Sequence, residues 1–299
     1  MNSFFMHIPS GFKRTRIAPT PSGYLHVGNV LSFIITAGLA AETGASILLR
    51  IDDMDRDRAE DRYVQDVFDT LRFLDIPWQE GPRNLQEFNS GWSQLYRLDE
   101  YNAALARLKQ SGQVFACNCS RSQLKSYVAY PGTCRHKNIP LDDPGVSWRL
   151  KTEPETISVK MLNGVVIQET LPAEMTDFVV RKKDSYPAYQ LSSVVDDVHF
   201  GIDLVVRGLD LWASTLAQLY LAQTLGLPFS NVTFYHHSLL LGSDGTKLSK
   251  SAGATSIKYM REQGYSTEEV LNAIAKQAGI SESVSNGRQL YERLKGSLP

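Results

Sequence analysis

The sequence predicts an α/β protein built on a parallel sheet. Strand-like and helix-like segments alternate along the first third of the chain, and Gly44 stands where a glycine commonly ends a helix. Such alternation is typical of a parallel sheet covered by helices, with its ligand site beyond the carboxyl ends of the strands. The expected elements are a strand at 14–19, a helix at 30–43, a strand at 46–51, and helices near 59–74 and 95–111.

The middle of the chain interrupts this alternation with cysteines, prolines and glycines between residues 117 and 156. Strands are expected there at 146–151, 156–160, 164–169 and 177–182. The sheet is expected to resume at 192–198 and 205–208, followed by a helix at 214–225, a strand at 232–236 and two or three amphipathic helices within 266–298. The predicted parts are a first sheet half at 1–112, an inserted subdomain at 113–185, a second sheet half at 186–258 and a helical tail at 259–299.

Composition limits the classes of function. The 299-residue chain is 42% hydrophobic and 21% charged, as in ordinary globular proteins, and its net charge is −1. Nucleic acid would therefore have to meet a local patch such as 181–183, which is otherwise a solvated hairpin tip. The apolar stretch at 30–41 is shorter than the ~20 residues that span a bilayer, so we expect no membrane association. The N-terminus lacks signal-peptide features. Three cysteines are an odd number and make a disulfide framework unlikely, so we expect a protein of the reducing cytoplasm.

Two polar motifs far apart in the sequence carry the chemistry. His26, Gly28 and Asn29 lie at the start of the first helical segment, and residues 247–251 read Lys-Leu-Ser-Lys-Ser. A helix N-terminus offers free N–H groups to phosphate, and a glycine lets a nucleotide approach the backbone. Lysines in a polar loop would stabilise the charge that builds on leaving pyrophosphate. The two motifs together indicate nucleotide chemistry.

As a pair, these motifs resemble the HIGH and KMSKS signatures of the class I aminoacyl-tRNA synthetases, which activate an amino acid with ATP. The resemblance implies a Rossmann-like catalytic domain that uses ATP and Mg²⁺. It implies catalytic roles for His26 and Lys250. The ATP-binding residues that it implies are His26, Gly28, Asn29, Lys247, Ser249 and Lys250.

Three further stretches, at 16–26, 49–53 and 206–208, resemble glutamyl-tRNA synthetases. An arginine grips a carboxylate through two parallel hydrogen bonds, whereas an ammonium group needs an anion. By this resemblance the glutamate side chain meets two arginines, its α-amino group meets an aspartate, and a tyrosine supplies a hydroxyl and a wall. The implied substrate-binding residues are Arg16, Ala18, Thr20, Asp52, Tyr189 and Arg207.

Each of these assignments has an alternative or a departure beside it. Arg207 can instead form a structural salt bridge with Asp210, and Tyr189 can be a core residue. The family usually has Glu where this chain has Asp52, and the shorter side chain of Asp52 retracts the carboxylate by one methylene group. The family also often has Ser where this chain has Thr20.

A narrower resemblance is to the glutamyl-Q tRNA(Asp) synthetases, truncated paralogues that attach glutamate to the queuosine base of tRNA(Asp). Gln190 agrees with their version of a motif in which full-length enzymes tend to have Asn, whereas 216–217 departs from the usual Pro-Arg. The stretch after Ser251 is too short for a helical anticodon-binding domain, so we expect none. The implied partners are L-glutamate and queuosine-containing tRNA(Asp), and we expect a monomer. Enzymes of this type activate glutamate without tRNA, which full-length glutamyl enzymes generally require.

The three cysteines form a cluster with metal-binding spacing. Cys117 and Cys119 flank one residue, Cys134 follows, and thiolates select zinc among the common ions. The placement of Tyr130 before Cys134 resembles the zinc pattern of the glutamyl-Q family, which implies Zn²⁺ bound by three cysteines and Tyr130 in a structural role. His136 is the alternative fourth ligand, and three free thiols are the alternative to a metal.

We therefore expect an enzyme that forms glutamyl-adenylate from glutamate and ATP and passes the glutamate to queuosine of tRNA(Asp). One alternative is a compact glutamyl-tRNA synthetase that charges a tRNA 3′ end. A second is a small-molecule nucleotidyltransferase, against which the glutamate-pocket motifs argue. A third is a non-catalytic paralogue that binds amino acids or RNA, which would not need His26, Lys247 and Lys250.

Overall fold

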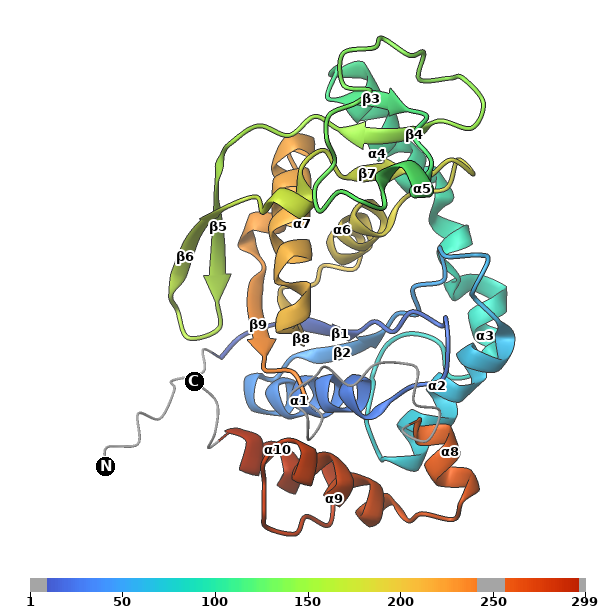
Figure 1. Cartoon of the computed structure of the whole chain (residues 1–299). Coiled ribbons are helices and arrows are strands. Elements are labelled where there is room, and N and C mark those ends of the chain that lie inside the picture. Colours follow the sequence, from blue (N-terminus) through green and yellow to red (C-terminus); the bar gives the residue numbers. More distant parts are fainter. Residues whose placement is uncertain (1–9, 241–255, 296–299) are drawn as a thin grey trace. The chain divides into compact units, whose positions relative to one another are not determined.

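A computed structural model of the chain describes residues 10–240 and 256–295 (Figure 1). The chain divides into two compact units, each discontinuous in sequence. The first unit comprises 1–94, 203–209 and 235–299, and the second comprises 95–202 and 210–234. The domain boundaries that the sequence suggested at 112, 185 and 258 stay predictions. Within the described residues, no helix is both long and apolar enough to cross a membrane.

The first unit is built on a parallel pair of strands. β1 (Arg14–Ile17) pairs with β2 (Ser46–Leu49), and Arg16 lies opposite Leu48. α1 (Val27–Thr43) makes the crossover that a parallel pair requires. Gly44 ends this helix in the left-handed conformation with φ 80°, as its position in the sequence predicted. The predicted parallel α/β arrangement is thus confirmed.

The rest of the first unit surrounds this pair. Asp203, which precedes β8 (Leu204–Gly208), accepts hydrogen bonds from the backbone N–H groups of Lys13 and Arg14 at 2.8 and 3.0 Å, so β8 begins beside β1. The remaining helices are α2 (Asp61–Phe73), α3 (Leu85–Glu87), α8 (Ile257–Glu262), α9 (Thr267–Gln277) and α10 (Gly287–Lys295). α9 and α10 confirm the predicted helical tail.

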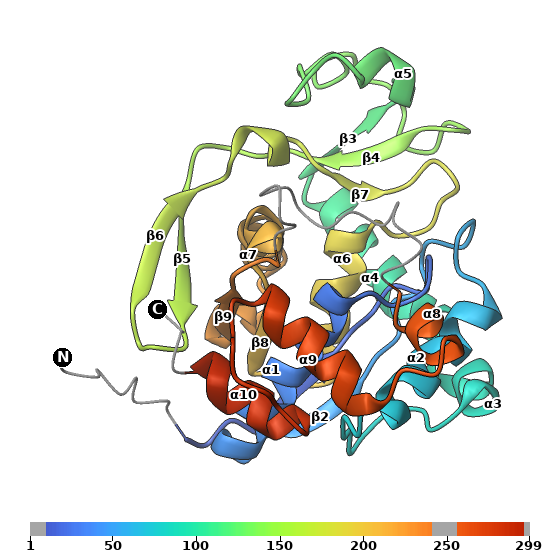
Figure 2. The same cartoon turned by 60° about the horizontal axis from the view of Figure 1, so that its bottom comes forward.

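α9 and α10 pack against α1 (Figures 1 and 2). The contact depends on Gly38 in the middle of α1, where a Cβ would lie 2.1 Å from Cγ of Tyr291. The Tyr291 ring, 1% exposed, therefore occupies the space that any other residue at position 38 would need. This packing fixes the helix whose N-terminus carries the histidine motif.

In its described residues, the second unit combines four α-helices with mostly antiparallel strands. The helices are α4 (Leu98–Gln110), α5 (Arg121–Leu124), α6 (Tyr189–His199) and α7 (Trp212–Leu225). One sheet has the order β3-β4-β7, formed by β3 (Val114–Cys117), β4 (Ser147–Leu150) and β7 (Val179–Arg181). A hairpin of β5 (Thr156–Met161) and β6 (Val166–Thr170) pairs in parallel, through β5, with the first two residues of β9 (Thr233–His237).

The segment 192–198, expected to resume the sheet, belongs to helix α6 instead. Its paired valines are typical of strands, but Val194 is fully buried on one side of a helix. Helical geometry brings the buried Asp196 to α4, where its carboxylate accepts from Arg97 at 2.7 and 3.0 Å and from the Tyr101 hydroxyl at 2.6 Å. This tertiary network overrides the local strand preference.

Candidate active site and metal site

The segments that follow β1 and β2 run side by side. Asp52 N–H donates to the Pro19 carbonyl at 2.9 Å, which ties the two strand ends together. Of the two predicted contact residues in the first segment, Ala18 is half-buried and Thr20 is exposed. The structure therefore places both in the same strand-end region as the buried Asp52, where α/β sheets bind ligands.

A buried arginine holds the Asp52 carboxylate. Arg50 Nε and Nη2 donate to its two oxygens at 2.7 and 3.0 Å, and the side chains are only 2% and 6% exposed. This bidentate geometry fixes the plane of the carboxylate. The next carboxylate, of Asp53, accepts from the Ser93 hydroxyl at 2.6 Å and from Gln94 N–H at 2.8 Å, which anchors the loop from its other side.

The role of Arg50 was missed by the sequence reasoning. The available signal was its spacing, because residues i and i+2 of an extended segment point to the same face. An arginine two positions before a functional carboxylate is therefore placed to orient it.

Arg16 and Arg207 bring two buried cations to neighbouring strands. They are 6% and 4% exposed, on β1 and β8 respectively. Arg16 Nη1 donates to the Val206 carbonyl at 3.3 Å, which joins the strand of one arginine to that of the other. Buried guanidinium groups are retained where an anion meets them, so this pair suits a carboxylate.

His236 lies against this cationic region as a neutral ring. Burial, together with the charges of Arg207 and Arg16, lowers the pKa of His236 from 6.5 to about 4. Because a carbonyl can only accept, the contact from His236 Nδ1 to the Gly208 oxygen at 3.1 Å places the proton on Nδ1. His237 similarly donates to its neighbour's carbonyl, and its Nε2 lies 2.5 Å from the Ser32 hydroxyl of α1.

His26 caps helix α1. Its Nδ1 accepts from Gly28 N–H at 3.1 Å, and the Asn29 side chain accepts from His26 N–H at 3.1 Å. Accepting at Nδ1 leaves the proton of the neutral ring on Nε2. A Cβ on Gly28 would lie 3.0 Å from the imidazole, so the glycine gives the histidine room to fold over the helix start. The three residues of the first motif are thus organised by one another.

A segment near the C-terminal end of the chain pairs with His26. Ser256 forms an antiparallel bridge with His26, and Ile257 N–H donates to the Leu25 carbonyl at 2.8 Å. The predicted residues of the second motif, Lys247, Ser249 and Lys250, lie outside the described residues.

Tyr189 belongs to the second unit, where it is the first residue of α6. Its side chain is 39% exposed, so core packing does not account for it. The adjacent Gln190 donates to the Ser214 hydroxyl at 3.1 Å and links α6 to α7. The first turn of α6, which carries Tyr189, is therefore held against α7.

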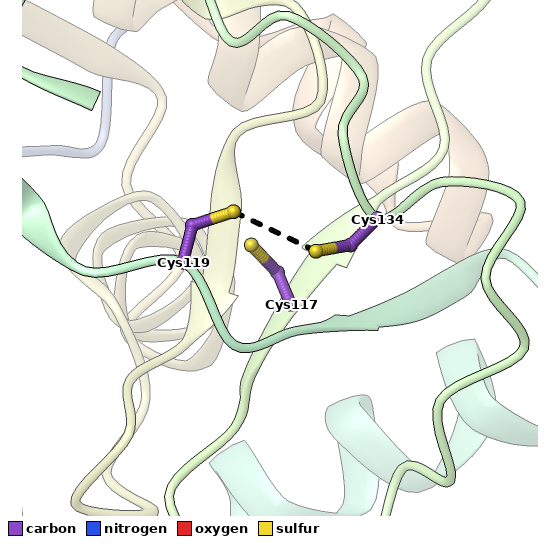
Figure 3. A group of neighbouring side chains, drawn as sticks. All are labelled: Cys117, Cys119 and Cys134. Carbon is purple, nitrogen blue, oxygen red and sulfur yellow. Dashed lines mark hydrogen bonds between the residues drawn. The ribbon is translucent and has the colours of Figure 1, made fainter. Parts of the chain in front are cut away.

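The three cysteines meet in the second unit, as Figure 3 shows. The sulfur atoms of Cys117, Cys119 and Cys134 lie within 4.8 Å of one another, and those of Cys119 and Cys134 are 3.6 Å apart. That separation is far from the ~2.05 Å of a disulfide. It is close to the ~3.8 Å that a tetrahedral zinc with Zn–S bonds of about 2.3 Å imposes. The donor set and its spacing therefore fit zinc.

Tyr130 completes the cluster. Its hydroxyl oxygen accepts from Cys134 N–H at 2.8 Å and hydrogen-bonds to the sulfurs of Cys117 and Cys134. Burial raises the pKa of the Cys117 thiol, but hydrogen bonds from Tyr130 and Arg149 outweigh it and lower the pKa to about 7. Burial and the two neighbouring sulfurs raise that of Cys119 to about 11. His136, the alternative ligand, is exposed and is not part of the cluster.

The basic residues 181–183 each have a partner within the second unit. Arg181 donates to the Ser185 hydroxyl at 2.6 Å, and Lys182 pairs with Asp184 at 2.9 Å. Lys183 donates to the carbonyl of Asn118, between two of the cysteines, at 3.0 Å. The turn that carries these charges is therefore tied to the cysteine cluster.

A parallel strand pair joined by a helix that His26 caps, with buried arginines on β1 and β8, is typical of an α/β domain that binds its ligand at the strand ends. A family model described as "tRNA synthetases class I (E and Q), catalytic domain" matches residues 13–138 and 137–293. The chain belongs to this family of ligase-type enzymes, the class I aminoacyl-tRNA synthetases.

Individual relatives carry two different names. The chain is 35% identical over 274 residues to "Glutamate--tRNA ligase" of Anaeromyxobacter sp. (strain K), covering 88% of this chain and 57% of that protein. It is 36% identical over 283 residues to "Glutamyl-Q tRNA(Asp) synthetase" of Symbiobacterium thermophilum, covering 89% of this chain and 86% of that protein. The chain thus spans little more than half the length of the glutamate ligases that it matches.

Solved structures support the fold. A crystal structure of glutamate-tRNA synthetase from Elizabethkingia anophelis superposes with a TM-score of 0.76 at 20% identity, covering 96% of this chain and 67% of that one. A glutamate tRNA ligase from Elizabethkingia meningosepticum gives a TM-score of 0.73 at 20% identity, covering 96% of this chain and 66% of that one.

Proposed function

We propose that the protein activates L-glutamate with ATP and Mg²⁺ and transfers it to queuosine in tRNA(Asp). The charge pattern of the first unit supports the activation of glutamate. Arg16 and Arg207 are buried cations on neighbouring strands, and Asp52 is a buried, oriented anion at a strand end. Glutamate offers the complementary groups: a side-chain carboxylate for the arginines and an ammonium group for the aspartate.

Activation then needs positioning and charge stabilisation. The α-carboxylate oxygen of glutamate attacks the α-phosphorus of ATP, the bond to the bridging oxygen breaks, and pyrophosphate leaves. His26, with its Nε2 proton, the N-terminus of α1 and Lys250 are the groups proposed to stabilise the phosphates. A hydroxyl of queuosine then attacks the glutamyl carbonyl, loses its proton and displaces AMP. No side chain forms a covalent intermediate.

The acceptor is proposed from similarity. The relative named glutamyl-Q tRNA(Asp) synthetase matches over 86% of its own length, and Gln190 agrees with the motif of that group. The glutamate--tRNA ligase relatives favour the alternative acceptor, a tRNA 3′ end. The proposed Zn²⁺ site consists of Cys117, Cys119, Cys134 and Tyr130 and would stabilise the segment that follows β3.

The first test is ATP–pyrophosphate exchange with glutamate, in the presence and absence of tRNA. Exchange without tRNA supports the proposed function, exchange only with tRNA(Glu) supports the charging enzyme, and no exchange under any condition refutes both. R16Q should raise KM for glutamate by about 10–100-fold, as expected for losing a charged hydrogen bond. Arg14 offers a matched control on the same strand, because it is a third exposed and pairs with Glu80, so R14Q should leave KM unchanged.

The acceptor is tested separately. Transfer of radiolabelled glutamate to tRNA(Asp) should depend on queuosine and should survive removal of the 3′-terminal adenosine. Label found on the 3′ terminal ribose would overturn the proposed acceptor while leaving the activation step intact.

A further inference from the structure

Arg149 of β4 is a buried cation without a carboxylate partner among the described residues. It is 9% exposed, and its Nη1 donates to the Asp177 carbonyl at 2.8 Å. Its Nε is buried and has no hydrogen-bond partner within the described part of the chain. Fully buried arginines are almost always paired, so this charge requires an anion from elsewhere.

The cysteine cluster lies where that anion is needed. The guanidinium carbon of Arg149 stacks 3.8 Å from the centre of the Tyr130 ring, and the group also hydrogen-bonds to the Cys117 sulfur. In register, Arg149 lies opposite Phe115, one of the apolar residues packed around the cluster. The cation is therefore in contact with two of the four proposed ligands.

Position then separates the two possible fourth ligands. The Arg149 guanidinium stacks on the Tyr130 ring and so holds the Tyr130 hydroxyl at the cluster, where it accepts from Cys134 N–H. The three thiolates that would bind Zn²⁺ give the complex a net charge of −1, which a buried guanidinium beside them balances. The exposed His136 has no such neighbour in the cluster.

Resting on the zinc site of the proposed function, we propose that Arg149 is a positioning residue of that site, which balances the charge of its three thiolates and holds the Tyr130 hydroxyl at the fourth position. The position of Arg149 is itself fixed by residues next to the cysteine cluster. Asp177, whose carbonyl holds Arg149, accepts at its carboxylate from Arg135, the neighbour of Cys134, at 2.7 Å. The ligand loop and the counter-charge are thus anchored on one residue.

The test measures zinc binding directly, by metal analysis and by competition of Zn²⁺ with a chromophoric chelator. R149Q, which keeps a donor for the Asp177 carbonyl but loses the charge, should bind zinc about 10–100-fold more weakly, as other residues supporting metal ligands do. R149K, which keeps the charge, should recover most of the affinity. R121Q is the matched control, because Arg121 is exposed on the nearby α5.

Tyr130 provides a second readout. If Arg149 acts through Tyr130, the loss in the Y130F/R149Q double variant should be smaller than the product of the two single losses. Circular dichroism checks that the variants fold, and R149K alone still decides if R149Q does not fold. Zinc affinity of R149Q equal to wild type, R149K as weak as R149Q, or independent losses in the double variant would each overturn the inference. Absence of zinc binding by the wild type would overturn the zinc site itself, whereas glutamate activation is measured independently.

Discussion

The neutral His236 predicts how the stability of the first unit depends on pH. In the folded protein its pKa is about 4, lowered by burial first and by the charge of Arg207 next, from an ordinary value of 6.5. The unfolded chain therefore takes up a proton below pH 6.5, whereas the folded chain resists until about pH 4. Stability is thus lost as pH falls through this window.

The magnitude follows from the size of the shift. Each pKa unit corresponds to about 1.4 kcal/mol, so between pH 7 and pH 4.5 this one histidine should lower the free energy of unfolding by about 2–3 kcal/mol. H236N removes the titration but keeps an N–H in the place of Nδ1, which can still donate to the Gly208 carbonyl. The variant should therefore lose less stability on acidification than the wild type, by that amount.

Urea unfolding at the two pH values measures the effect. H199N is the matched control, because it makes the same substitution at a histidine whose side chain is 40% exposed. Equal acid destabilisation of H236N and wild type would refute the reasoning, since it would mean that His236 is not held neutral by burial.

Three further changes test the packing and the ion pairs. R50Q removes the guanidinium that pairs with the buried Asp52 carboxylate, so it should cost about 3–5 kcal/mol in unfolding free energy and raise KM for glutamate without changing KM for ATP. An unchanged KM for glutamate would argue against an orienting role. G38A places a Cβ against the Tyr291 ring and should lower the free energy of unfolding by about 1–3 kcal/mol in urea, despite the better helix propensity of Ala. In a Y291A background, where the ring is absent, the same G38A change should cause no further loss. D196N removes the charge at the centre of the α4–α6 network and should cost about 3–5 kcal/mol in the same assay; a loss under 1 kcal/mol would show that the network is dispensable.

Local patterns predicted much of the first unit. The strand at 46–51, the helix that Gly44 ends and the capping position of His26 all depend on residues close in sequence. Short-range preferences of this kind are readable because the same few residues make the stabilising contacts. The grouping of the three cysteines was also predicted, since two of them flank a single residue.

Long-range contacts account for what the sequence did not predict. The strand expected at 192–198 is a helix because Asp196 meets Arg97 and Tyr101, which are nearly one hundred positions away. The β3 strand was missed because its apolar residues merge with the irregular cysteine segment, and its pairing with β4 spans thirty residues. Neither contact leaves a periodic trace in the local sequence.

Arg50 and Arg149 show how charge balance identifies residues that act through a ligand rather than on it. The anion of Arg50 is a carboxylate of the chain itself, so its pairing is part of the folded state and R50Q should weaken folding without any ligand present. The anion proposed for Arg149 is the complete metal complex, so R149Q should affect zinc affinity far more than metal-free stability. The resemblance to a family identifies residues expected to contact substrate or metal. The partners of buried charged groups identify the residues that hold those contact residues in position.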